Sequence, residues 1–419
     1  MDHLLHLKCL ICGKSYSPDE IDYVCPDHGN EGIVDAQYDY DLIGRRISRG
    51  DLLHCTDYSI WRYKPLLPVK PDAAVPPLTV GWTPLYRVDR LAGELGLKHL
   101  WVKDDGRLPT ASFKDRASAI AVVKGQERGA RIITTASTGN AAAALSGLCA
   151  SVKQPNVIFV PENAPQAKIA QLLTFGSTVM LVRGTYDDAF ELCLQAAREY
   201  AWYNRNTGYN PYMSEGKKTV SYEICEQLRW QAPDRIFVSV GDGCIIGGIH
   251  KGLKDLLAMG WIDRMPKLMG VQAEGSAYLY QAWQKGEDVL TKPPIVAQTV
   301  ADSISAGLPR DRLKAMAAVK ETSGAYLTVS DDEILAAIPA LARGCGVFAE
   351  PAGAAAYAGL LKAIGEGLVS PDERIVVINT GNGLKDVASA MKAVDRIGPR
   401  PYRVAPDLED LKRVLAEIS

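Results

Sequence analysis

The chain has 419 residues, of which 47% are hydrophobic and 23% charged, and its formal net charge is −2. This is the composition of a globular protein with two or three domains. The near-neutral balance excludes a broad surface for nucleic acid or anionic membrane. The sequence contains no run of 18 apolar residues, so no membrane-spanning helix is predicted.

Residues 1–35 predict a zinc-ribbon-like module. The stretch "CLICGK" holds Cys9 and Cys12 as a C-x2-C pair, and "CPDHG" holds Cys25 and His28 as a C-x2-H pair. Thiolates together with an imidazole suit a tetrahedral structural zinc site. The alternative is a ribbon in which one ligand has changed and no metal binds, and the spacing leaves both open.

The N-terminal residues and the remaining cysteines bear on location. The stretch "MDHLLHLKCLICGK" lacks the continuous apolar run of a signal peptide. Six further cysteines are single and scattered, which suits a reducing cytoplasm better than a disulfide framework. We therefore expect a cytoplasmic protein. The six are Cys55, Cys149, Cys193, Cys225, Cys244 and Cys345.

Residues 36–80 are irregular and rich in Tyr, Asp and Pro, which predicts a linker or arm. From residue 80 onward, short apolar runs alternate with longer helical stretches, as in a wound parallel sheet. Residues 401–419 indicate a peripheral tail with a strand-like piece and an amphipathic helix. Strands are expected at 99–103, 131–137, 156–161, 178–183, 235–241, 267–275 and 374–381. Helices are expected at 115–128, 140–150, 165–175, 185–200, 214–231, 245–258, 275–285, 331–343 and 352–366.

Ligands bind beyond the carboxyl ends of strands in open α/β sheets, and two loops at such ends carry reactive groups. In "PTASFKDRAS", Lys114 stands among small residues, and a buried lysine amine can form an imine with an aldehyde cofactor. In "TTASTGNAAAAL", Ser137, Thr138 and Asn140 open a helix whose free N–H groups attract anions. The plain alternatives are an exposed lysine at a helix start and an ordinary N-cap.

Two later loops complete the set. In "VSVGDGCIIGGIHKG" (238–252), glycines follow a strand and precede a helix, so backbone N–H groups are able to wrap a phosphate. The alternative is a tight turn. In "VVINTGNGLKD" (376–386), a buried strand ends at Thr380, whose neutral hydroxyl suits contact with a cofactor ring nitrogen.

Taken together and in this order, the motifs resemble those of the fold-type II pyridoxal-phosphate (PLP) enzymes of the tryptophan synthase β-subunit-like superfamily, and of threonine synthases in particular. The resemblance covers residues 80–390 and also rests on "GWTPLYRVDRLAGELG", "NPYMSEGKKTVSYEI" and "VFAEPAGAAAYAGL". It implies two wound α/β domains, a small one at 115–222 and a large one from 81–114 and 223–400, with the ribbon as an appendage.

The resemblance also implies roles for individual residues. Lys114 matches the catalytic Schiff-base lysine, Asn140 the residue that bonds the cofactor's phenolic oxygen, and Thr380 the partner of the pyridine nitrogen. The loop that binds the cofactor phosphate matches Gly241, Asp242, Gly243, Cys244 and Ile245. The loop that holds the substrate carboxylate matches Ser137, Thr138 and Gly139.

The sequence departs from the family pattern at several positions. Ala111 stands where threonine synthases usually have Gly, and Asn382 where "TGHGLKD" has His. Met213 stands where many members have an Arg that helps to bind the substrate phosphate, so a strong anion contact is missing. Arg107, in "DDGRLPT", is a candidate to supply that charge, and a plain surface arginine is the alternative.

The resemblance implies a cytoplasmic, homodimeric carbon–oxygen lyase with PLP and a small-molecule amino-acid substrate. The expected reaction is that of threonine synthase, in which O-phosphohomoserine loses phosphate and gains water to give threonine. Met213 and Asn382 keep a second reading open, which is β-elimination or β-replacement of the serine/threonine dehydratase, diaminopropionate ammonia-lyase or cysteate synthase type. A non-catalytic binding protein is disfavoured by the retained Lys114, Asn140 and Thr380.

Overall fold

The computed structural model describes residues 1–137, 139–164, 166–398 and 401–418, and it contains three sheets. The largest has six strands in the order β12-β11-β10-β13-β5-β4. Neighbouring strands are parallel except at one edge, where β4 runs antiparallel to β5. The strands are β4 (Leu85–Arg87), β5 (His99–Asp104), β10 (Arg235–Ser239), β11 (Lys267–Ala273), β12 (Ala325–Val329) and β13 (Arg374–Asn379).

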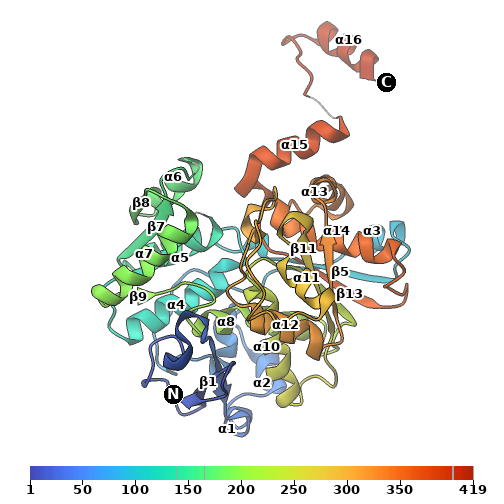
Figure 1. The fold of residues 1–419 in the computed structure, drawn as a ribbon. Coiled ribbons are helices and arrows are strands. Elements are labelled where there is room, and N and C mark those ends of the chain that lie inside the picture. Colours follow the sequence, from blue (N-terminus) through green and yellow to red (C-terminus); the bar gives the residue numbers. More distant parts are fainter. Residues whose placement is uncertain (138, 165, 399–400, 419) are drawn as a thin grey trace.

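A second sheet has four parallel strands in the order β8-β7-β6-β9. Helices α5, α6 and α7 surround it, and Figure 1 shows this unit beside the larger sheet. The strands are β6 (Ile133–Ala136), β7 (Asn156–Pro161), β8 (Thr178–Val182) and β9 (Tyr203–Asn204). The helices are α4 (Lys114–Glu127), α5 (Asn140–Ser151), α6 (Gln166–Thr174) and α7 (Tyr186–Glu199).

Helices cover both faces of the large sheet, because its strands are apolar on both sides. Along β10, Ile236 and Val238 pack in one hydrophobic core with α10 and α12, whereas Phe237 packs in another with α13 and α14. Near-continuous apolar runs are typical of parallel strands buried in this way. The helices are α3 (Asp89–Glu94), α8 (Tyr212–Lys217), α9 (Thr219–Gln227), α10 (Cys244–Ala258), α11 (Tyr278–Lys285), α12 (Arg312–Glu321), α13 (Asp331–Cys345) and α14 (Pro351–Gly365).

The two α/β units confirm the expected fold class. The strands of the small sheet come from residues 133–204, and those of the large sheet from 85–104 and 235–379. These ranges lie inside the two domains expected from the sequence. The domain boundaries at 114–115 and 222–223 stay a prediction.

The N-terminal residues form a small antiparallel sheet in which β1 (Leu4–Cys9) pairs with β2 (Ser15–Tyr16) and β3 (Val34–Tyr38). Figure 1 shows this sheet below α8 and α10. Its apolar side chains belong to the same core as those of α10. Polar contacts reinforce the packing, since the Tyr38 hydroxyl donates to Glu215 (2.6 Å) and the Lys251 amine lies 3.0 Å from Asp35. The module is therefore built into the body of the protein.

The structure corrects some expectations. Residues 36–80 hold α1 (Tyr40–Gly44), α2 (Arg49–His54) and the 3-10 helix Ile60–Leu66, which buries Tyr63. These elements have only five to seven residues each, too few to show a helical period in the sequence. The predicted strand-like piece in the tail does not form, since the described residues 401–407 are irregular, while the helix is present as α16 (Leu408–Ile418). The sequence reading missed β4, β12, α12 and α15 (Val387–Ile397).

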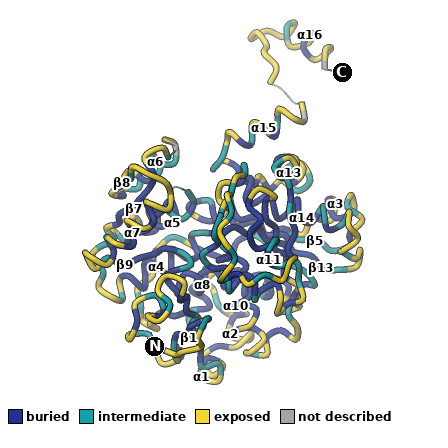
Figure 2. The backbone as a smooth tube through the Cα atoms, in the orientation of Figure 1, coloured by how far each residue is buried: buried dark blue, intermediate teal, exposed yellow. Residues whose placement is uncertain are grey.

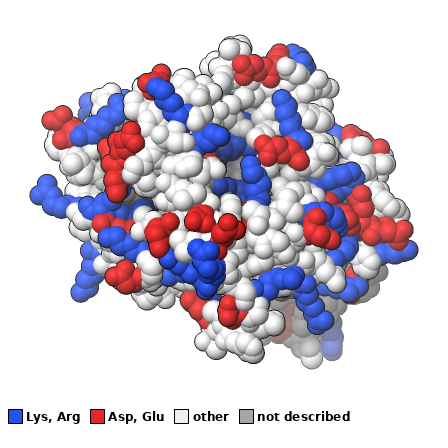
Figure 3. Space-filling model, turned by 90° about the horizontal axis from the view of Figure 1, so that it is seen from below, with Lys and Arg blue, Asp and Glu red and all other residues white. Residues whose placement is uncertain are grey.

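The surface agrees with the composition. Figure 2 shows buried backbone concentrated in the two sheets and the helices between them, and exposed backbone along α16, which projects from the body. Figure 3 shows acidic and basic side chains interspersed over the face seen from below, without a continuous basic stripe. None of the described helices is long and apolar enough to cross a membrane.

Candidate active site

Lys114 is the first residue of α4, and two backbone hydrogen bonds hold the loop before it in place. The Phe113 N–H donates to the Thr380 carbonyl (2.9 Å), and the Asn382 N–H donates to the Ala111 carbonyl (3.0 Å). These bonds hold the lysine loop against the end of β13, the central strand that the sequence reading singled out. Lys114 and Thr380 are therefore brought to the same place by the fold.

The environment of Lys114 favours its neutral amine. Burial lowers the pKa of Lys114, and the positive charge of Arg205 lowers it further, although Cys244, Asp242 and Glu350 oppose the shift. Among the residues that the structure describes, no carboxylate forms an ion pair with Lys114. A lysine held in this way is a suitable nucleophile for an aldehyde.

The glycine loop joins β10 to α10 through close backbone contacts. A Cβ atom at Gly241 would lie 2.7 Å from the Ile304 Cα, and Gly243 adopts the left-handed conformation with φ of 85°. Only glycine fits both requirements easily. The loop therefore leaves the N–H groups at the start of α10, at Cys244 and Ile245, available for an anion.

Asp242 carries an acidic side chain in a loop expected to bind a phosphate, and its hydrogen bonds show a structural role. Its carboxylate accepts from the Arg310 N–H (3.2 Å), and its carbonyl accepts from the Asp311 N–H (2.9 Å). Burial raises the pKa of the Asp242 carboxyl. Asp242 thus ties the glycine loop to the segment before α12.

Asn140, the first residue of α5, bonds to a residue that the sequence reading did not select. Its amide donates to Glu350 (2.7 Å) and to the Ser303 hydroxyl (3.4 Å). Glu350 is buried, and burial raises the pKa of its carboxyl to about 7. The sequence signal was "VFAEPAG", in which an acid before a proline at a helix start looks like an ordinary N-terminal residue.

A cleft of about 420 Å³ opens beside these groups, within the range of small-molecule sites. Gly139 and Asn140 line it together with Glu350 and two cations, Lys168 and Lys385, and the binding roles expected for Gly139 and Asn140 stay predictions. Lys168 forms an ion pair with Asp302 (2.6 Å), which joins α6 to the opposite side of the cleft.

Two other described residues predicted to contact the substrate are not among those that line the cleft. The Ser137 hydroxyl accepts from the Gly139 N–H (3.3 Å), so it shapes the turn before α5. Thr138 lies outside the described residues. Arg107 is exposed and does not line the cleft.

At the end of β13 the Thr380 hydroxyl lies 3.5 Å from the hydroxyl of Ser239, and both side chains are buried. A pair of neutral hydroxyls suits an unprotonated ring nitrogen, because neither group carries a charge that would hold a proton on it. Thr380 therefore offers a neutral hydroxyl at the end of β13, and its contact with the ring nitrogen stays a prediction.

Two more buried cations lie near Lys114. Burial lowers the pKa of Arg205 to about 10 and that of Lys217 to about 8. One guanidinium nitrogen of Arg205, Nη2, has no hydrogen-bond partner although it is buried. Together with the free helix start of α10, this positive charge calls for an anion. A buried lysine with a lowered pKa, a glycine loop, buried cations and a neutral hydroxyl form a set of groups that suits PLP.

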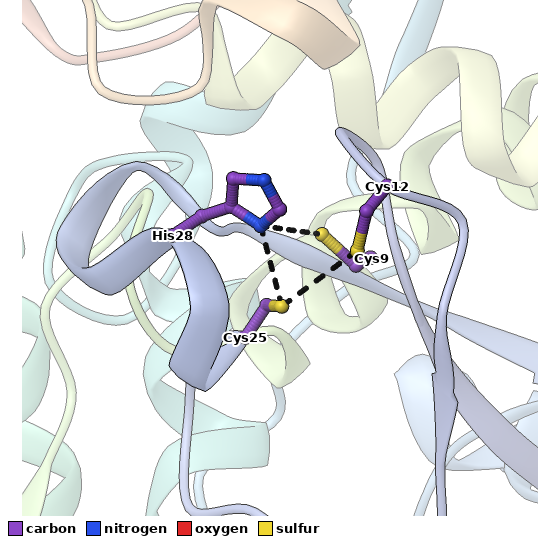
Figure 4. A group of neighbouring side chains, drawn as sticks. All are labelled: Cys9, Cys12, Cys25 and His28. Carbon is purple, nitrogen blue, oxygen red and sulfur yellow. Dashed lines mark hydrogen bonds between the residues drawn. The ribbon is translucent and has the colours of Figure 1, made fainter.

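The N-terminal module brings its four predicted ligands together, as Figure 4 shows. The ligand atoms of Cys9, Cys12, Cys25 and His28 all lie within 4.8 Å of one another. The Cys12 and Cys25 sulfurs are 3.9 Å apart, and the Cys25 sulfur is 3.5 Å from the His28 Nδ1. Ligands about 2.3 Å from a tetrahedral zinc ion lie about 3.5–3.8 Å from one another. The side chains therefore already have zinc-site spacing.

Comparisons with known proteins agree with this site. The family described as "Pyridoxal-phosphate dependent enzyme" matches residues 77–381. The threonine synthase of Methanocaldococcus jannaschii is 39% identical over 413 residues, which cover 98% of this chain and 99% of that protein. The threonine synthase of Methanosarcina acetivorans is 40% identical over 386 residues, which cover 91% of this chain and 93% of that protein. The chain therefore belongs to the pyridoxal-phosphate-dependent enzymes and, within them, to the threonine synthase family.

Solved structures share the fold at lower identity. Threonine deaminase isoform 2 from Solanum lycopersicum superposes with a TM-score of 0.66 and 22% identity, covering 86% of this chain and 89% of its own. Diaminopropionate ammonia lyase from Escherichia coli superposes with a TM-score of 0.64 and 20% identity, covering 75% and 88%. At this identity the likeness supports the fold alone.

Proposed function

We propose that this protein is a PLP-dependent carbon–oxygen lyase that converts O-phosphohomoserine and water into threonine and inorganic phosphate. The observation that carries the proposal is the convergence of Lys114, Asn140, Thr380 and the α10 helix start in a chain that matches threonine synthases over nearly its full length. When bound, PLP supplies the electron sink for the chemistry, and the protein supplies orientation and proton transfer.

Lys114 performs the proton transfers in this proposal. Its amine takes the proton from Cα of the substrate and later moves a proton at Cβ, so that phosphate leaves Cγ and water adds at Cβ. Burial lowers the pKa of the Lys114 amine, which favours the neutral form that accepts a proton. The overall change is balanced, since one water enters and one phosphate leaves.

The groups around Lys114 orient the substrate and the cofactor. The turn at Ser137 and Gly139, at the start of α5, is placed to hold the substrate carboxylate with backbone N–H groups. Asn140 is able to release Glu350 and donate to the phenolic oxygen of the cofactor instead. Thr380 would offer the ring nitrogen of bound PLP a neutral hydroxyl, which does not hold a proton on that nitrogen.

The distal end of the substrate is less constrained. Arg107 stays a proposal from the sequence, and its exposure outside the cleft weighs against it. Met213 is 1% exposed and belongs to the hydrophobic core, so no cation occupies that position. This observation favours the second candidate function, which is elimination or replacement on a shorter amino acid.

A direct assay separates the two functions. The purified protein is incubated with O-phosphohomoserine, and threonine and inorganic phosphate are measured together. Equal amounts of both support the threonine synthase proposal. Serine, threonine and diaminopropionate are tested in parallel for release of ammonia and a 2-oxo acid. Turnover of one of these without phosphate release from O-phosphohomoserine supports the second function.

We also propose that Cys9, Cys12, Cys25 and His28 bind one structural zinc ion. Their spacing supports it, and so does the Tyr16 hydroxyl, which lies 3.0 Å from the Cys25 sulfur. The wild type is expected to hold one zinc per chain by metal analysis. Because Cys12 is exposed, Cys12→Ser removes a ligand with little loss of packing. Cys55→Ser is the control.

Zinc loss from the Cys12→Ser variant alone, with a lower melting temperature, supports the site. A wild type that binds no zinc after reconstitution, or a Cys12→Ser variant that keeps it, rules the site out.

The homodimer and the cytoplasmic location are also proposals. Leu384, Val387 and Met391 are exposed apolar side chains spaced three and four residues apart around α15, which supports an interface there. All nine cysteines are free, as expected in a reducing compartment. Light scattering on the full chain tests the dimer, and Val387→Asp should weaken it.

A further inference from the structure

Arg205 is a buried arginine without a charged partner. It follows β9, and its N–H donates to the Thr134 carbonyl (2.8 Å), which fixes its backbone in the small sheet. Its guanidinium donates from Nε to the Ser118 hydroxyl (3.1 Å) and from Nη1 to the Thr207 hydroxyl (2.9 Å). Nη2 is buried and has no partner. The side chain is 1% exposed.

The contacts of Arg205 direct it toward the cofactor groups. Ser118 lies four residues after Lys114 on α4, so both are on the same face of that helix. Thr207, which accepts from Arg205, also accepts from the Lys217 amine (3.4 Å). Lys217 in turn packs against α10, because a Cβ at Gly248 would lie 2.6 Å from the Lys217 Cβ. Arg205 and Lys217 thus lie between Lys114 and the first turns of α10.

The charge of this pair is not balanced by protein groups. Within the described part of the chain, neither Arg205 nor Lys217 forms an ion pair with a carboxylate. The acids that act on them at longer range are Asp115 and Asp311, and Asp115 is already bonded to Thr110. Two buried cations without a counter-ion are costly, and a bound dianion offsets that cost.

We propose that Arg205, with Lys217, binds a phosphate monoester at the start of α10. The inference rests on the proposed function for the identity of the ligand, which is either the phosphate of the cofactor or the phosphate of the substrate. A buried guanidinium whose Nη2 has no partner is suited to donate hydrogen bonds to a phosphate.

The test compares Arg205→Met with wild type and with Arg183→Met, a control at an exposed arginine. Binding of PLP and of pyridoxal, which lacks the phosphate, is measured by absorbance titration. If Arg205 holds the cofactor phosphate, affinity for PLP falls about 10- to 100-fold while affinity for pyridoxal is unchanged. If it holds the substrate phosphate, PLP binding is unchanged, and KM for O-phosphohomoserine and inhibition by inorganic phosphate weaken by that factor.

A second measurement needs no turnover and separates a binding role from a packing role. Inorganic phosphate is added to apoprotein freed of PLP, and the melting temperature is recorded. The wild type is expected to be stabilised by phosphate, and Arg205→Met is not, although without phosphate it melts at the same or a higher temperature because an unpaired buried charge is gone. Arg205→Lys should restore part of the phosphate effect.

The inference is overturned if Arg205→Met leaves every phosphate-dependent affinity unchanged, or if it weakens PLP and pyridoxal binding equally. It is also overturned if Arg205→Met lowers the melting temperature while the response to phosphate stays intact. A wild type that responds to inorganic phosphate but releases none from O-phosphohomoserine supports the phosphate site and contradicts the proposed function instead.

Discussion

The Asn140 amide donates to the Glu350 carboxylate across 2.7 Å, and this bond joins the first turn of α5 in the small sheet unit to the residue that precedes α14 in the large one. Both groups are buried beside the cleft. Asn140 is expected to donate to the phenolic oxygen of the cofactor. If it does, Glu350 and that oxygen compete for the same amide.

Replacement of Glu350 by Gln should change how stability depends on pH. Burial raises the pKa of Glu350 to about 7, so the folded protein keeps a proton there that the unfolded chain loses near pH 4.5. Stability of the apoprotein from this group is therefore present at low pH and is lost as pH rises toward and through 7. Glu350→Gln should match wild type at pH 5 and unfold with a free energy about 1–3 kcal/mol higher at pH 8.

Denaturant unfolding of the apoprotein at the two pH values measures this difference. The Gln carbonyl of the variant is still able to accept from Asn140, so the two proteins differ at this site mainly in the titration of the side chain. A Glu350→Gln variant that is less stable than wild type at pH 8 contradicts the assignment of a neutral, buried carboxyl.

Replacement of Ala111 by Gly should stabilise the protein. Ala111 has φ of 63°, a left-handed conformation that costs an L-residue about 1–2 kcal/mol and costs glycine little. Glycine's extra freedom in the unfolded chain offsets part of the gain, so the net increase is about 0.5–1 kcal/mol. Ala117→Gly, inside α4, is the matched control and should be destabilising by about 1 kcal/mol. Equal loss of stability in both variants would argue against strain at Ala111.

A larger side chain at Gly241 should weaken cofactor binding. Its Cβ would meet the backbone of Ile304 at 2.7 Å, and backbone cannot rotate away as a flexible side chain does. The glycine loop must then shift from the α10 helix start. Gly241→Val should bind PLP at least about 10-fold more weakly by absorbance titration. Gly93→Val, at an exposed position without a left-handed φ and with nothing within 4 Å of the added Cβ, controls for a general effect of valine.

Lys114 should carry the cofactor covalently. Purified protein with PLP is expected to be yellow, and borohydride reduction followed by peptide mapping should label Lys114. Lys114→Ala should lose the label and activity while PLP still binds weakly through the phosphate site. Label on Lys217 or Lys385 instead would show that another amine reacts.

Much of this account was accessible from the sequence. The apolar runs of β6, β7, β10, β11 and β13 could be predicted because strands buried on both faces are nearly continuous in hydrophobic residues. The lysine, asparagine, glycine and threonine loops could be placed because each follows such a strand. The residues within each of these segments were sufficient to predict it.

The remainder depends on contacts between distant segments. Glu350 looks like an ordinary residue before a helix, and only the fold sets it against Asn140. Arg205 lies in "NRNTG", where nothing signals burial without a counter-ion. The left-handed φ of Ala111 depends on the position of its loop, which is set by the hydrogen bond from Asn382. Such relationships have no periodicity in the sequence.

The conversion of O-phosphohomoserine into threonine is tested by measuring both products together. Wild-type protein with PLP is incubated with O-phosphohomoserine, and phosphate and threonine are quantified over time, with Lys114→Ala as the control. The account predicts one phosphate released for each threonine formed, and no product with Lys114→Ala. Release of no phosphate, together with formation of a 2-oxo acid and ammonia from serine, threonine or diaminopropionate, would contradict it.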